Sequence, residues 1–230
     1  MAGADATSGP TGRAPDSRAA VRALQRRLQN LYGIELSACV GDFLCDAETV
    51  RQLAGEQELH RGEVLLVAQD EDGVFVGLYV DPSAAAALAA CDGEPEGCFG
   101  AFCLVAEGVS HFVYLMYRAE RDRPVSQLEL ELQAEVDKYA TALLSGGGVG
   151  ALRLRSRLLR HRLFERARFV DAPGSERGER YRLATRAAAR FAARLEAEHL
   201  RRGDLQGLAR ALRRFYRLGL REKLQLALGR

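Results

Sequence analysis

The sequence lacks the cysteine pattern of a metal-binding or disulfide-rich protein. Its five cysteines are odd in number, and none of them form a CxxC pair. This spacing argues against a zinc ribbon and against a small secreted fold. We expect reduced thiols that pack as small hydrophobic side chains, which fits a cytoplasmic location. The cysteines are Cys39, Cys45, Cys91, Cys98 and Cys103.

An export signal is also missing. The first 16 residues, MAGADATSGPTGRAPD, are small and polar, and no apolar segment follows a basic start. We expect residues 1–16 to be a disordered tail. The longest apolar run, FGAFCLVAEGVSHFVYLMY, covers residues 99–117 and is close to membrane-spanning length, but Glu107 and His111 near a bilayer centre would be costly. We interpret it as a buried core segment, and expect no membrane contact.

The net charge of +2 hides a strong asymmetry along the chain. Residues 1–150 hold 11 basic against 23 acidic side chains, whereas residues 151–230 hold 22 against 8. SGGGVG, residues 145–150, lies between them and is typical of a flexible hinge. The sequence therefore predicts an acidic α+β module over residues 17–144 and a basic helical region over residues 151–230.

The hydrophobic pattern predicts several elements. Ser17 begins a helix that ends near Gly33, and EVLLVAQ and VFVGLYV form a β-hairpin around DEDG. Ser126 and Glu129 form a capping box for a further helix, and Asp204 caps the last long helix. The expected fold class is α+β: a small helical N-terminal module with a β-hairpin and a buried central helix, followed by an Arg-rich helical bundle.

The apolar run carries one polar stripe. At helical spacing, its polar residues fall within an arc of about 120°, which favours a helix over a hairpin that turns at Glu107-Gly108. Gly108 is unfavourable in a helix but permits the close approach of another element. We expect Glu107 to be ionised and buried, held by His111 and by an arginine from residues 151–194. The stripe consists of Glu107, Ser110, His111, Tyr114, Tyr117 and Arg118, and the helix that follows offers Gln127, Glu131, Glu135 and Lys138 as partners.

Metal chemistry is an alternative at this stripe. A zinc peptidase of the zincin type needs HExxH, but Ala106 stands in place of the first histidine and lies five residues before His111. A carboxylate-bridged di-metal bundle would use helical pairs instead. Because such pairs arise easily by chance, we expect no metal, no cofactor and no catalytic activity. The weak catalytic candidates are Glu107, His111, Glu131 and Glu135, and the bundle would use these as two pairs together with His161 and Glu165, and Glu196 and His199.

A second alternative is nucleic-acid or polyanion binding through an arginine ladder. Four arginines repeat at four-residue spacing opposite an Ala/Phe/Leu face, and arginine forks bind phosphates well. No known nucleic-acid-binding motif accompanies them, and the acidic half would repel the same ligand. The ladder consists of Arg182, Arg186, Arg190 and Arg194.

The function that we expect first is a non-catalytic interaction or scaffold protein. Oppositely charged halves can dock on each other or on a protein partner, with charge complementarity setting the register. The metal-dependent hydrolase at Glu107 and His111, of degenerate zincin-like type, is the remaining alternative. The sequence indicates neither a substrate nor an oligomeric state.

Overall fold

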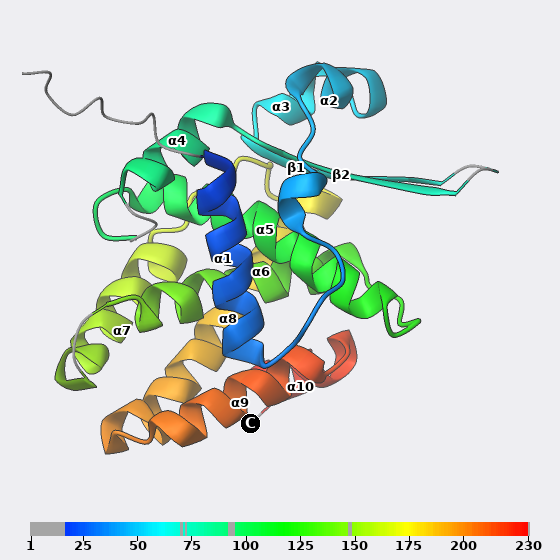
Figure 1. Ribbon diagram of the computed structural model, residues 1–230. Coiled ribbons are helices and arrows are strands. Elements are labelled where there is room, and N and C mark those ends of the chain that lie inside the picture. Colours follow the sequence, from blue (N-terminus) through cyan, green and yellow to red (C-terminus); the bar gives the residue numbers. More distant parts are fainter. Residues whose placement is uncertain (1–16, 70, 72, 92–94, 147–148, 230) are drawn as a thin grey trace, which may run out of the picture.

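The computed structural model describes residues 17–69, 71, 73–91, 95–146 and 149–229 (Figure 1). The expected tail, residues 1–16, and Gly147 and Gly148 of the expected hinge lie outside the described residues. The described chain is mostly helical, with one antiparallel β-hairpin against a buried central helix. The long elements are α1 (Ser17–Tyr32), β1 (Glu63–Gln69), β2 (Val74–Val80), α5 (Phe99–Ala119), α6 (Gln127–Leu144), α8 (Glu176–Glu198) and α9 (Leu205–Arg217). The short helices are η1 (Val40–Asp42), α2 (Ala47–Leu53), α3 (Glu56–Leu59), α4 (Pro82–Ala90), η2 (Val149–Ala151), α7 (Leu152–Arg160), η3 (His161–Glu165), η4 (Leu200–Arg202) and α10 (Leu220–Leu228).

The expected caps explain where several helices begin. Asp204 accepts a hydrogen bond from the Gly207 amide at the start of α9, as predicted. Ser126 accepts one from the Glu129 amide at the start of α6. The Glu129 side chain does not complete the expected capping box, because it turns inward and accepts a hydrogen bond from Tyr114.

The hairpin pairs Glu63 with Val80, and its far end projects away from the helices (Figure 1). Its near end lies against α5 at Gly108. A Cβ atom at Gly108 would lie 3.1 Å from Cδ1 of Leu78 and 3.2 Å from Oε2 of Glu63. The prediction that Gly108 permits a close approach is therefore confirmed, and the element that approaches is the hairpin.

The apolar run forms the single helix α5, so the helical interpretation is confirmed over the hairpin alternative. It is long and apolar enough to cross a membrane, but more than half of its most apolar window is buried inside the fold. The helix packs mainly on α6, and α6 packs in turn on α8. A central helix of this kind is typical of a protein core.

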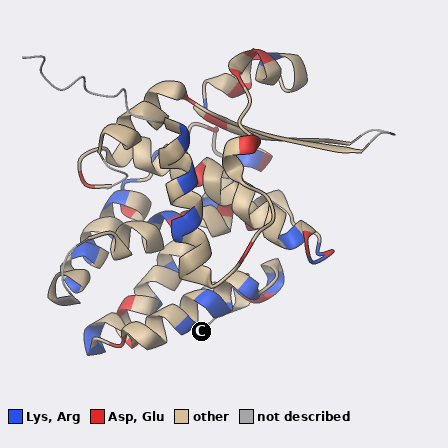
Figure 2. Cartoon of the chain, in the orientation of Figure 1, with Lys and Arg blue, Asp and Glu red and all other residues tan. Residues whose placement is uncertain are grey.

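One hydrophobic core contains buried side chains from both halves of the chain. Tyr32 of α1 stacks on Tyr216 of α9, with ring centroids 3.9 Å apart, and α6 lies against α8. Basic side chains are concentrated on α7 to α10 (Figure 2).

Burial raises the pKa of the Cys103 thiol to about 12, as expected for a cysteine that packs in the core and does not react.

The basic half begins with a helix that ends in a π turn. The helix α7 ends at Arg160, and one π-helical turn, η3, follows it before the chain becomes irregular. The next helix, α8, begins at Glu176, where Ser175 caps it. This π turn aims arginines at a pocket described below.

Candidate functional site

The polar stripe of α5 divides into two separate clusters. Glu107 and His111 face a group of carboxylates at one side of the helix, whereas Ser110, Tyr114 and Arg118 face a closed polar network. We call the first group the carboxylate cluster and the second the buried network. The carboxylate cluster consists of Glu63, Glu107, His111, Glu131, Glu135 and Lys138.

Three elements supply the carboxylate cluster. Glu63 comes from the start of β1, Glu107 and His111 lie one turn apart on α5, and Glu131 and Glu135 lie one turn apart on α6. His111 lies between two carboxylates, with Nδ1 3.6 Å from Oε2 of Glu63 and Nε2 3.6 Å from Oε2 of Glu131. The structure therefore brings all four weak catalytic candidates of the sequence together and adds Glu63.

Lys138 is the cationic partner of Glu107. Its Nζ donates to Oε2 of Glu107 at 2.8 Å and to Oε1 of Glu135 at 2.9 Å. The expectation that Glu107 is held by an arginine from residues 151–194 is wrong within the described residues. Lys138 is the partner instead, because α6 packs directly on α5 and places the Lys138 side chain next to Glu107.

Burial and charge oppose each other inside the cluster. Burial would lower the pKa of His111, but the charges of Glu63 and Glu131 outweigh it and raise that pKa well above its usual value. Burial would raise the pKa of Glu107, yet Lys138 and His111 lower it, which favours the expected ionised carboxylate. For Glu63 and Glu135, burial prevails and raises the pKa of both carboxyl groups.

The cluster holds more negative charge than its own cations balance. With all four carboxyl groups ionised, one ammonium and one protonated imidazole leave two negative charges without a balancing cation in the cluster. Nε2 of His111 and Oε2 of Glu63 are buried and have no hydrogen-bond partner among the described residues. Ligand atoms of Glu107, His111 and Glu131 lie within 4.8 Å of one another. Buried polar atoms without partners are costly, and a cation would satisfy them.

A cavity of about 570 Å³ opens beside the cluster. Its lining includes Glu63, Glu107, Glu135 and Lys138 of the cluster, and Tyr181 of α8. Burial raises the pKa of Tyr181, and the charges of Glu131, Glu107 and Glu63 add to the effect, so this hydroxyl is a neutral donor beside the carboxylates. The carboxylate cluster is therefore connected to a space that a small molecule can enter.

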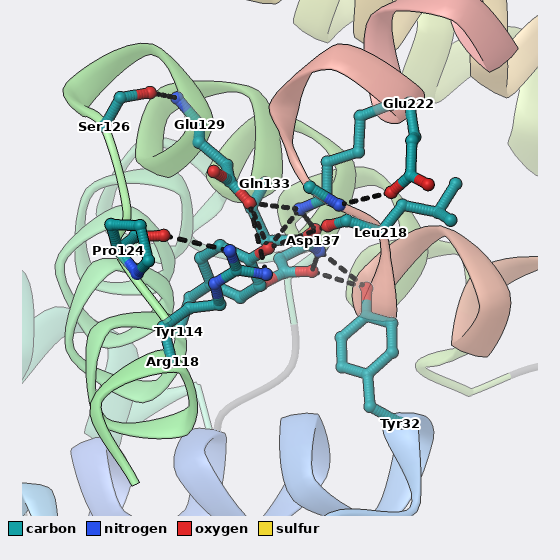
Figure 3. Close-up of polar contacts among 12 residues, drawn as sticks. Tyr32, Tyr114, Arg118, Pro124, Ser126, Glu129, Gln133, Asp137, Leu218 and Glu222 are labelled. Carbon is teal, nitrogen blue, oxygen red and sulfur yellow. Dashed lines mark hydrogen bonds and ion pairs between the residues drawn. The ribbon is translucent and has the colours of Figure 1, made fainter. Parts of the chain in front are cut away.

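The side chains of the buried network, in contrast, are almost wholly shielded from solvent. Lys223 of α10 is fully buried and donates to the Tyr114 hydroxyl and to Oε1 of Gln133, both at 2.7 Å. Asp137 accepts hydrogen bonds from Tyr32, Ser110 and Gln133. Figure 3 shows how Tyr32 of α1, Tyr114 of α5, and Gln133 and Asp137 of α6 converge. Because every member is enclosed, we assign this network to the joining of the two halves.

The arginine ladder is largely occupied within the chain. Arg182 donates to the carbonyl oxygen of Asp171, Arg190 to that of Leu228, and Arg194 to that of Leu226. Arg186 is exposed. These contacts hold the last helix and the loop before α8, so most of the ladder does not present an open row of guanidinium groups.

The other helical pairs that were candidates for a metal lie away from the carboxylate cluster. His161 pairs with Glu165 at 2.8 Å on the exposed surface. Glu196 accepts hydrogen bonds from Ser156 and Arg160. His199 pairs with Asp204. The four-pair bundle expected as one alternative therefore does not assemble among the described residues.

Sequence reasoning missed Glu63, Tyr181 and Lys223. Glu63 begins a strand whose pattern shows a face but not a neighbour, and Tyr181 lies on an arginine-rich helix. The signal for Lys223 was available: the chain uses lysine only at 138 and 223, among arginines elsewhere, and both lysines are buried.

Comparisons with protein-family models, with curated proteins and with solved structures gave no match.

Proposed function

We propose that the carboxylate cluster binds one divalent metal ion and that the chain is a metal-dependent hydrolase. The observation that carries this proposal is Nε2 of His111, which lies 3.6 Å from Oε2 of Glu131 but has no hydrogen-bond partner among the described residues, in a side chain that is 7% exposed. Glu107, His111 and Glu131 are the proposed ligands, and Glu63 lies next to them. A mixed imidazole and carboxylate site suits Zn²⁺, Mn²⁺ or Fe²⁺ better than Ca²⁺.

The surroundings of these ligands support a catalytic use. A bound divalent ion would supply Lewis acidity and a water of lowered pKa, beside a cavity that admits a substrate. Glu63 and Glu135 are placed to accept a proton, while Lys138 fixes Glu107 and Glu135 in position. The ligands come from two helices, so the proposed centre differs from a zincin, whose two histidines share one helix.

Titration calorimetry with Mn²⁺, Zn²⁺ and Mg²⁺ tests the proposal. We expect about one site per chain that prefers Mn²⁺ or Zn²⁺, and a loss of affinity of at least about tenfold in His111→Ala. His161→Ala is the matched control, because His161 also has a glutamate one helical turn away but is exposed. Equal affinity in wild type and His111→Ala, or equal loss in both variants, would reject the metal site.

The interaction function expected from charge asymmetry stays a second candidate. This function would require the fold to consist of an acidic α+β module and a separate Arg-rich helical bundle. It has weaker support than the metal site, because much of the opposite charge is used inside the chain: Arg177 pairs with Glu58, and Arg155 with Glu96. A protein partner, if present, would therefore compete with internal ion pairs.

A further inference from the structure

The outer part of the cavity carries a basic rim, which we define as Arg162, Arg166 and Arg168. All three side chains line the cavity and are exposed, and no ion pair or side-chain hydrogen bond engages their guanidinium groups within the described part of the chain. Other arginines nearby are paired: Arg61, at the opposite wall, lies 2.9 Å from Asp171. The rim is thus a set of positive charges without ion-pair partners, in the same cavity as Glu63, Glu107 and Glu135 of the carboxylate cluster, which we call its acidic floor.

The π turn at η3 explains how the rim faces the cavity. The Arg166 amide donates to the His161 carbonyl at 3.0 Å, which is the wider hydrogen bond of a π turn. Arg162, inside this turn, lies over the Phe99 ring, with its guanidinium carbon 3.8 Å from the ring centroid. A stacked guanidinium keeps its N–H edges free to donate to a ligand.

Aromatic and apolar side chains also line this cavity. Phe99, Phe169 and Tyr181 line the cavity, and Val170 at its mouth is 91% exposed. Phe169 is held in place by Arg182, whose guanidinium lies 4.9 Å from the ring centroid. One open cavity is therefore lined by basic, aromatic and carboxylate side chains.

We infer that this cavity binds a small organic phosphate, with the phosphate between the basic rim and the proposed metal and the organic group against the aromatic wall. The inference rests on the proposed function for its second anchor. Three arginine forks offer more donors than the two oxygens of a carboxylate can accept, whereas a phosphate supplies further acceptor oxygens. The volume of about 570 Å³ lies within the range of small-molecule sites. A long polyanion would meet the acidic floor, so a small molecule fits better than a nucleic acid.

Calorimetry with phenyl phosphate on the full chain, with and without Mn²⁺, tests the inference. We expect Arg162→Gln combined with Arg166→Gln to weaken binding by at least about tenfold, because each hydrogen bond between charged groups is worth about that factor. The matched control is Arg153→Gln combined with Arg157→Gln, which removes the same charge from exposed positions on α7. The control should bind within about twofold of wild type. Circular dichroism checks that both variants are folded.

Three further probes identify the ligand class. Benzoate should bind more weakly than phenyl phosphate if phosphate is what the rim recognises, and inorganic phosphate should bind more weakly if the aromatic wall contributes. A 20-base-pair DNA duplex should bind more weakly than phenyl phosphate. Tighter duplex binding that depends on the same arginines would overturn the inference in favour of nucleic acid.

The outcomes separate this inference from the proposed metal function. Binding of phenyl phosphate that depends on the rim, in a chain that binds no Mn²⁺, would keep the ligand class and reject the metal. Binding of Mn²⁺ without any binding of phenyl phosphate would keep the metal and reject the ligand class. Equal weakening in the rim variant and its control would also overturn the inference, because it would show only a general charge effect.

Discussion

The Nζ atom of Lys138 lies 2.8 Å from Oε2 of Glu107, and this ion pair joins α5 to α6 at the floor of the cavity. The side chains are 8% and 19% exposed, so water compensates little for the loss of either partner. The pair therefore stabilises the packing of α5 on α6 and also positions Glu107 as a proposed ligand.

Glu107→Gln should lower the free energy of unfolding by about 3 kcal/mol in metal-free buffer. The change leaves a buried ammonium with only Glu135 as its partner, and breaking a buried pair typically costs about 3–5 kcal/mol. Denaturant unfolding measures the effect. Glu165→Gln, at an exposed i,i+4 pair, should change stability by no more than about 0.5 kcal/mol. An unchanged midpoint in Glu107→Gln would contradict the buried pair.

Gly108→Ala should reduce the free energy of Mn²⁺ binding by more than it reduces the free energy of unfolding. The added methyl group meets the side chains of Leu78 and Glu63 at 3.1–3.2 Å, so these side chains must shift, and the Glu63 carboxylate changes its position relative to His111. Calorimetry with Mn²⁺ measures the effect. Gly100→Ala is the matched control, since Gly100 lies on the same helix with open space around it. If both variants bind Mn²⁺ like wild type, the close approach has no role in the site.

Lys223 should make stability depend on pH. Burial lowers its pKa to about 7, although Glu129 and Asp137 on α6 oppose this, and Arg118 on α5 also faces it. The unfolded chain keeps an ordinary lysine pKa near 10.4, so from about pH 7 upward it binds a proton that the folded chain has lost. The free energy of unfolding should then rise with pH, by up to about 1.4 kcal/mol per unit.

The variant Lys223→Met isolates that contribution. The free energy of unfolding of the wild type minus that of the variant should increase between pH 7 and 8.5. The same difference should stay constant between pH 5 and 6. Comparing the two chains at each pH cancels the titration of other groups. A difference that does not change with pH would show that Lys223 keeps an ordinary pKa in the folded chain.

The sequence was most informative for α5, where a few polar residues interrupt a long apolar run. Glu107, His111 and the other polar residues of α5 stood out against an apolar run, and Gly108 indicated a close neighbour. The pairing of Glu107 could not be derived, because local patterns do not say which of many cations lies nearest. Glu63 remained hidden for the same reason: the register of a hairpin shows which side chains share a face, but not which helix covers them.

The central claim is that Glu107, His111 and Glu131 hold a divalent ion. The most direct measurement is an anomalous difference map from crystals of the full chain grown with MnCl₂. We predict one strong peak within roughly 2–2.3 Å of a ring nitrogen of His111 and of carboxylate oxygens from Glu107 and Glu131, the usual range for such ligands. A map without a peak in this cluster, or with its main peak at the exposed pair of His161 and Glu165, would contradict the claim.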